Sequence, residues 1–336
     1  MKYFLLLLIS FYFMACKNNE VNPPTEEIEV VPTPIGFPKM PVPLDNKLTE
    51  DRILLGKKLF FDKQLSSNQE ISCSSCHLQN NAFSDSSQFS LGINKLVGER
   101  NAPPLFNLAW NTSFFWDGGV PTLEQQVIGP ITNPIEMNMT LGEVIQRITK
   151  DTNYLNMFKK AYDTLPSAGY LTKSIASFMR SMVSSESKYD KYINGDTNLF
   201  NDQEKKGLHL FFGESVQCHH CHIGYNFTTN KFANNGSKEI YKDLGRKKIT
   251  KLDIDLGKFK IPSLRNIAVT SPYMHDGSYK TLEEVIENYN KGGSGHPNQD
   301  PTIYKLNLSN EDKNNLIAFL KTLTDQNFIS NPKYKQ

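Results

Sequence analysis

The sequence predicts an all-α fold made of two related domains, and two observations indicate it. Apolar residues recur at helical spacing after capping-box residues, and no run sustains the alternation that is typical of a strand. Residues 103–127 and 262–286 also align without a gap and share many identical residues. A supersecondary unit that recurs at a constant offset indicates internal duplication.

The expected helices can be placed in order along the chain. Three of them begin at residue pairs with capping-box spacing: Thr140 with Glu143, Thr281 with Glu284, and Ser309 with Asp312. Another is indicated by residues at helical spacing: Ile175, Phe178, Met179 and Met182. The apolar faces that should form the core are Val144, Ile145, Ile148, Leu155 and Phe158, then Val285, Ile286 and Tyr289, then Leu316, Phe319, Leu320 and Leu323.

Two Cys-x-x-Cys-His pentapeptides carry the chemistry of the chain. They are Cys73-Ser74-Ser75-Cys76-His77 and Cys218-His219-His220-Cys221-His222. In such a motif both thiols can bond to the vinyl groups of a haem, and the adjacent histidine can bind its iron. The sequence therefore predicts two covalently attached haem c groups, one in each domain.

Three other uses of these cysteines remain open but explain less of the pattern. A structural zinc site usually has its second pair of ligands about 12–20 residues away, whereas these pairs are about 145 residues apart. A redox Cys-x-x-Cys pair needs no histidine after it. A disulfide across two residues would be strained, and it would not explain the two histidines.

The N-terminal residues look like an export signal. Lys2 is followed by an apolar run from Phe4 to Met14, which is too short to span a bilayer. Cys16 follows Ala15 and resembles the lipid-attachment cysteine of a bacterial lipoprotein, although Phe13 stands where leucine is commoner. The alternative is an ordinary signal peptide with an incidental cysteine.

These features predict where the protein resides. Residues 1–15 would be the signal peptide, and residues 16–45, rich in Asn, Pro and Glu, would form a flexible tether. We expect a periplasmic protein that is attached to the membrane only through a lipid on Cys16. The net charge of +2 and the lack of a basic block give no reason to expect nucleic acid as a partner.

The remaining chain would hold an N-terminal haem domain at residues 46–195 and a C-terminal haem domain at residues 196–330. The aligned segments differ where chemistry is expected. Trp116 aligns with His275 and Gln126 with Val285, and the first half also has an acid at Glu136. A polar pocket in one domain and an apolar one in the other suggest that one haem reacts and the other relays electrons.

The sequence resembles the bacterial dihaem cytochrome c peroxidases, the family that also contains MauG. The resemblance covers about residues 45 to 325. The matching stretches are Arg100-Asn101-Ala102-Pro103, Phe115-Trp116-Asp117-Gly118, residues 123–130, Glu136-Met137, residues 259–266 and residues 272–277. The resemblance implies two cytochrome c-like domains, with the peroxidatic haem in the first.

The resemblance also implies roles for individual residues. Trp116 matches a tryptophan that carries electrons between the haems, and Gln126 and Glu136 match the distal glutamine and the distal acid. A carboxyl group whose pKa is raised by apolar surroundings can take up and deliver the protons of peroxide cleavage. The alternatives without a catalytic role are that Trp116 is a core residue and that Gln126 and Glu136 lie on a helix surface.

Calcium is implied by the resemblance alone. Asn101, Thr270 and Pro272 match positions that bind calcium between the two domains, the last two through backbone carbonyls. The other histidines, namely His209, His219, His220 and His296, are expected to be surface or packing residues and not ligands.

Two positions depart from typical peroxidases of this family. Ile93 stands where many members have a histidine that blocks the resting peroxidatic iron, so we expect an enzyme that needs no reductive activation. Tyr289 stands where peroxidases have a methionine that binds the second haem, whereas MauG-type members have tyrosine there. Alternatively, Tyr289 packs in the helix face and Met274 or another group is the ligand.

The leading interpretation is a dihaem peroxidase that reduces hydrogen peroxide to water with electrons from a small cytochrome c or copper protein (a cupredoxin). One alternative is a MauG-like haem enzyme that oxidises a partner protein. A dihaem electron carrier is a third interpretation, but a carrier would need neither Gln126 nor Glu136. A homodimer is left open.

Overall fold

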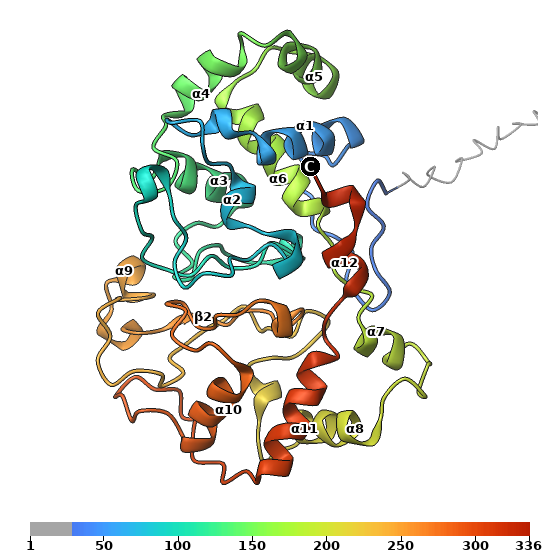
Figure 1. Cartoon of the computed structure of the whole chain (residues 1–336), viewed down its shortest axis with the longest axis vertical. Helices are drawn as coiled ribbons and strands as arrows, with labels where there is room; N and C mark the ends of the chain where they lie inside the picture. The colour runs from blue at the N-terminus through green and yellow to red at the C-terminus, as the bar shows by residue number, and fades with distance from the viewer. Residues whose placement is uncertain (1–28) are drawn as a thin grey trace, which may run out of the picture.

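The computed structural model describes residues 29–336, so the expected signal peptide and Cys16 lie outside the described residues. The described chain folds into two stacked lobes (Figure 1). The first lobe contains α1 Glu50–Phe61, α2 Cys73–Cys76, α3 Leu123–Thr132, α4 Leu141–Ile148, α5 Thr152–Tyr162 and α6 Ala168–Ser181. The second contains α8 Asp202–Phe212, β1 Phe232–Ala233, α9 Lys247–Thr250, β2 Phe259–Lys260, α10 Leu282–Lys291 and α11 Asn310–Lys321.

Two further helices connect the lobes. The helix α7, Lys188–Ile193, lies in the passage from the first lobe to the second, and α12, Gln326–Ser330, returns from the second lobe to the first (Figure 1). The only strands in the described part are β1 and β2, which pair antiparallel over two residues each. The fold is therefore mostly helical, as predicted, and no helix among the described residues is long and apolar enough to cross a membrane.

The predicted helix starts are confirmed. Capping boxes open α4 at Thr140, α10 at Thr281 and α11 at Ser309, and α6 contains Ile175, Phe178 and Met179. The apolar stripe from Val144 to Phe158 is divided between α4 and α5, because α4 ends at Ile148 and Asp151 caps the start of α5.

The tether predicted for residues 16–45 is wrong over its second half. Val31 and Met40 are buried in the core of the first lobe, and Phe37 packs against Trp110 at 5.1 Å between ring centroids. Trp110 also donates from Nε1 to the carbonyl of Pro38 at 3.0 Å. This segment is anchored because it buries large apolar side chains, although its many prolines made it resemble a tether.

The same local features occur in both lobes. The helix α1 packs against α6 through Gly56, where an added Cβ would lie 1.9 Å from the carbonyl oxygen of Ser174. The helix α8 packs against α11 through Gly207, where an added Cβ would lie 1.9 Å from the carbonyl oxygen of Asn315. Only glycine allows helices to approach this closely.

An ion-pair group joins the two lobes. Arg100 pairs with Asp117 at 2.7 Å in the first lobe and with Asp243 at 2.7 Å in the second.

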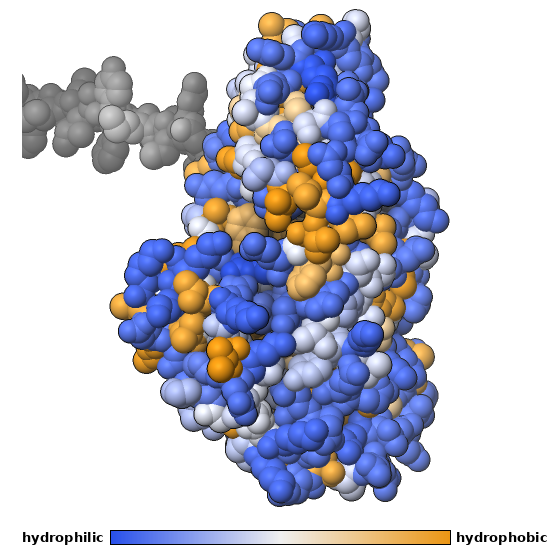
Figure 2. All heavy atoms as spheres, turned by 60° about the vertical axis from the view of Figure 1, so that its left-hand side comes forward, coloured by the Kyte–Doolittle hydropathy of each residue, from blue (hydrophilic) through white to orange (hydrophobic). Residues whose placement is uncertain are grey.

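Several large apolar side chains remain exposed on loops: Leu91, Leu96, Val97, Leu252 and Ile254. Figure 2 shows a group of apolar side chains in the middle of one face, near the height at which the lobes meet in Figure 1.

Candidate active site

Each Cys-x-x-Cys-His motif lines its own cavity. The cavity of the first lobe has a volume of about 590 Å³ and contains Cys73, Cys76 and His77 in its wall. The cavity of the second lobe has a volume of about 230 Å³ and is lined by the two cysteines and the final histidine of the second motif, Cys218, Cys221 and His222. All four of these cysteines are free thiols, so the disulfide alternative is not realised.

The surroundings of the motif cysteines do not favour redox exchange. Burial raises the pKa of Cys73 and of Cys218 to about 12, and of Cys76 to about 11. A redox-active cysteine usually has its pKa lowered by nearby positive charge. Neutral thiols in a largely apolar wall fit thioether attachment.

Both motif histidines are held in one orientation. The Nδ1 of His77 lies 2.7 Å from the carbonyl oxygen of Phe83, and the Nδ1 of His222 lies 3.1 Å from that of Phe227. Since a carbonyl only accepts hydrogen bonds, Nδ1 carries the proton and Nε2 is left to bind a metal. Burial lowers the pKa of both imidazoles, to about 4 for His222, which keeps them in the neutral form that a ligand requires.

The donors at both sites thus fit a covalently attached haem. Cys73, Cys76 and His77 would hold it in the first cavity, and Cys218, Cys221 and His222 would hold it in the second. Two thiols and a neutral imidazole with a fixed tautomer face each cavity, which is the donor set that this group uses.

The first cavity also contains the predicted acid and amide. Gln126 on α3 and Glu136, in the turn after α3, both line it. Burial raises the pKa of Glu136, while Asn133 donates from Nδ2 to its Oε1 at 2.7 Å and opposes the rise. The structure therefore brings a protonatable carboxyl group and an amide to the cavity of the first motif.

Neither Asn133 nor Gly92 was expected from the sequence to border the site. The N–H of Ile93 donates to the carbonyl oxygen of Glu136 at 2.8 Å, and a Cβ on Gly92 would lie 1.8 Å from the carbonyl oxygen of Ile135. The loop that carries Ile93 thus presses against the turn that carries Glu136. Ile93 itself is buried and 3% exposed.

Trp116 lines both cavities. Its Nε1 donates to the carbonyl of Asn101 at 2.8 Å, and its own carbonyl accepts from the N–H of Lys260 at 2.8 Å. Asn101 thus holds the indole of Trp116, and Lys260 of the second lobe holds its backbone. This placement is what a connection between two redox groups requires.

Lys260 is a buried cation that the sequence did not mark. It lines both cavities beside Trp116, and its Nζ donates to the carbonyl of Ser113 at 3.1 Å. Burial lowers its pKa to about 8. The sequence alone does not mark Lys260 as a residue of a buried site, because most lysines lie at the surface.

The second cavity has different walls. Tyr289 and Met274, the two alternative ligands, both line it, and Asn235 contacts both from Nδ2, at 3.1 Å to the sulfur and 3.5 Å to the phenol. Burial raises the pKa of Tyr289 to about 12. Val285 lines this cavity at the position that aligns with Gln126, so an apolar side chain stands where the first cavity has an amide, and His275 lines it at the position that aligns with Trp116.

The three positions matched to calcium lie together. Asn101, Thr270 and Pro272 all line the second cavity. The amide nitrogen of Asn101 donates to the carbonyls of Ser87 and Gln88, which leaves its Oδ1 as the atom that a cation could use.

Comparisons with known proteins agree with this geometry. A sequence model of the family described as di-haem cytochrome c peroxidase matches residues 50–198. The methylamine utilization protein MauG of Methylorubrum extorquens is 36% identical over 288 residues, covering 84% of this chain and 81% of that protein. Cytochrome c551 peroxidase of Nitrosomonas europaea is 34% identical and covers 85% of this chain and 84% of that protein.

A solved structure is similar over most of its length. The crystal structure of a MauG-like protein associated with microbial copper homeostasis superposes with a TM-score of 0.86 and 36% identity. The match covers 90% of this chain and 97% of that one.

Proposed function

The chain belongs to the di-haem cytochrome c peroxidase family of oxidoreductases, and on that premise we propose that it reduces hydrogen peroxide in its first cavity. One observation carries the proposal: a carboxyl group with a raised pKa, Glu136, lines the same cavity as Cys73, Cys76 and His77. Membership of the family implies two c-type haems.

Haem, when bound, supplies the iron centre at which peroxide is reduced. The residues around it handle the protons and the orientation of the substrate. Glu136 takes a proton from one oxygen of peroxide and delivers it to the other, and burial raises the pKa of its carboxyl group, which favours the uptake of that proton. Asn133 fixes the carboxyl group through its 2.7 Å hydrogen bond, and Gln126 orients peroxide without competing for the proton.

The second cavity would receive electrons from a small cytochrome c or a cupredoxin. We place Trp116 on the route between the two cavities, because it lines both and is held by Asn101 and Lys260. The exposed apolar side chains near the junction of the lobes suit a transient contact with such a donor (Figure 2).

Several finer features belong to this proposal. The matching glycine crossings of Gly56 and Gly207 support an origin by duplication. Residence in the periplasm, a lipid on Cys16 and a calcium ion at Asn101, Thr270 and Pro272 follow from the sequence and the family.

A second candidate function is oxidation of a partner protein, the activity that the resemblance to MauG implies. Tyr289, the MauG-type residue, lines the second cavity, and Ile93 takes the place of the histidine of typical peroxidases. The similarity to MauG from Methylorubrum extorquens favours the same candidate. Both candidates use the first cavity in the same way and differ in the source of the electrons.

Steady-state turnover of hydrogen peroxide with reduced cytochrome c tests the proposal. Rapid oxidation of the cytochrome supports the peroxidase. Slow oxidation, together with peroxide-dependent oxidation of a co-purifying protein seen by mass spectrometry, selects the second candidate. If peroxide oxidises neither the cytochrome nor a partner protein, the chain is an electron carrier and the proposal is wrong.

A further inference from the structure

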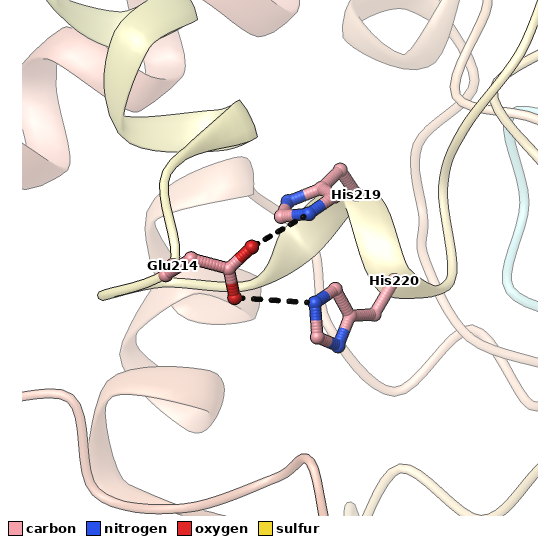
Figure 3. Close-up of side chains that lie close together, drawn as sticks. All are labelled: Glu214, His219 and His220. Atoms are coloured by element: carbon pink, nitrogen blue, oxygen red, sulfur yellow. Dashed lines mark ion pairs between the residues drawn. The ribbon is translucent and has the colours of Figure 1, made fainter.

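The second haem-attachment motif has a feature that the first lacks. Its two middle residues are histidines, His219 and His220, whereas Ser74 and Ser75 occupy these positions in the first motif. Both histidines turn toward Glu214, which lies in the loop between α8 and the motif (Figure 3). The three side chains therefore converge on one point beside the second motif.

The separations are those of metal ligands. The Nε2 of His219 lies 3.5 Å from one oxygen of Glu214, and the Nε2 of His220 lies 3.4 Å from the other. These contacts are longer than the roughly 2.7–2.9 Å of a charge-assisted hydrogen bond. Two atoms that each lie about 2.1 Å from a tetrahedral ion are about 3.4 Å apart.

Backbone hydrogen bonds order the loop that carries the two rings. The N–H of Gln217 donates to the carbonyl of Gly213 at 3.0 Å, and the N–H of His220 donates to that of Gln217 at 3.1 Å. The rings of His219 and His220 meet edge to face at 4.6 Å. The two imidazoles thus already lie side by side before an ion binds.

We propose that Glu214, His219 and His220 bind one divalent transition-metal ion of the zinc or copper(II) class. Two imidazoles and one carboxylate are ligands that these ions accept, whereas magnesium and calcium prefer oxygen ligands alone. The side chain of Glu214 is 77% exposed and that of His220 is 37% exposed, so water completes the coordination. None of these three residues is among the expected haem ligands or the calcium positions.

The test titrates zinc and copper(II) into the full-length, haem-loaded protein after treatment with a chelator. We expect one ion per chain by calorimetry, and an electron paramagnetic resonance spectrum of copper(II) that shows coupling to imidazole nitrogen. His220→Gln and Glu214→Gln should each weaken binding by at least about tenfold. His209→Gln, which changes an exposed histidine outside the cluster, should leave binding unchanged.

Haem content separates loss of the metal site from loss of the fold. Glu214 lies outside the Cys-x-x-Cys-His motif, so Glu214→Gln should retain two haems per chain by absorbance. The proposal is overturned if the wild-type protein binds no ion, or if Glu214→Gln, with its full haem content, binds as tightly as the wild-type protein. Since the readout is metal affinity, it does not depend on peroxide turnover.

Discussion

The two cavities have the same framework but different walls. In each lobe a left-handed turn, at Gly118 or Gly277, leads to a threonine-capped helix, α3 or α10, that borders the cavity. The helix presents Gln126 to the first cavity and Val285 to the second. The backbone therefore provides two similar sites, and a few side chains decide which one can handle protons.

The largest effect is expected from replacing Glu136, an acid that lines only the first cavity. Glu136→Gln keeps the shape of the side chain and its contact with Asn133 but cannot take up a proton. We expect peroxide turnover to fall by about 10²–10⁴-fold, the usual contribution of a general acid–base. The measurement is kcat/KM for peroxide with reduced cytochrome c.

A matched control is Glu70→Gln, at an exposed glutamate of the same lobe. It should keep full activity. If both variants are equally active, Glu136 takes no part in the reaction, and the comparison between the cavities loses its basis.

The next prediction tests whether the two helix crossings are equivalent. Gly56→Ala and Gly207→Ala each place a Cβ 1.9 Å from a backbone oxygen, which forces the helices apart. We expect each to lower the free energy of unfolding by about 1–3 kcal/mol, as overpacking usually does. Gly169→Ala is the control, because its Cβ meets nothing within 4 Å.

Thermal unfolding of the haem-loaded variants provides the measurement. Gly169→Ala should be neutral or stabilising by up to about 1 kcal/mol. A loss at Gly56 with none at Gly207 would show that only the first lobe depends on close helix contact.

A smaller effect is expected in the pH dependence, which only the first cavity should show. Burial raises the pKa of Glu136 above its ordinary value of 4.5, and a base works only when unprotonated. The value of kcat/KM should therefore rise with pH through this raised pKa. Because the folded state holds the proton more tightly than the unfolded state, the free energy of unfolding should fall as the pH rises from 4.5 through that pKa.

Activity and thermal melting recorded from about pH 4 to pH 8 check both slopes. Glu136→Gln should remove the contribution of Glu136 to the pH dependence of the activity and to that of the melting temperature. A melting curve of this variant that keeps the wild-type slope would assign the pH dependence to other groups.

The smallest expected effect concerns the wall of the second cavity. Tyr289→Phe removes one hydroxyl group and a 3.5 Å contact with Asn235, so the stability should change by less than about 1 kcal/mol. If the phenol binds the second haem, the visible spectrum of the oxidised protein should change. An unchanged spectrum refutes the ligand assignment, and Met274→Leu then tests the alternative residue, which lines the same cavity.

Local signals predicted much of this structure. Thr140, Thr281 and Ser309 start helices because a capping box is complete within four residues. Cys73, Cys76 and His77 were found for the same reason, since their chemistry is set by their spacing. Trp116, Gln126 and Glu136 needed the comparison of the two halves and the family resemblance.

What the sequence concealed depends on contacts between distant segments. Asn133 gains its role from facing Glu136, and Lys260 from being buried beside Trp116. The packing of Val31 and Met40 is likewise invisible in a segment whose composition resembles a tether. His219 and His220 were expected to be surface or packing residues. Their contact with Glu214 could not be seen in the sequence, because Glu214 precedes them by several residues and only the loop brings it near.

The path of the C-terminus has a consequence for how the molecule is made. Phe328 and Tyr334, at the end of the chain, are buried in the core of the first lobe, and Tyr334 donates to the carbonyl of Ser181 at 2.9 Å. The part of the protein that begins first on the ribosome is thus finished last. A product cut short after α11 would lack Phe328 and Tyr334 and would therefore leave the core of the first lobe open.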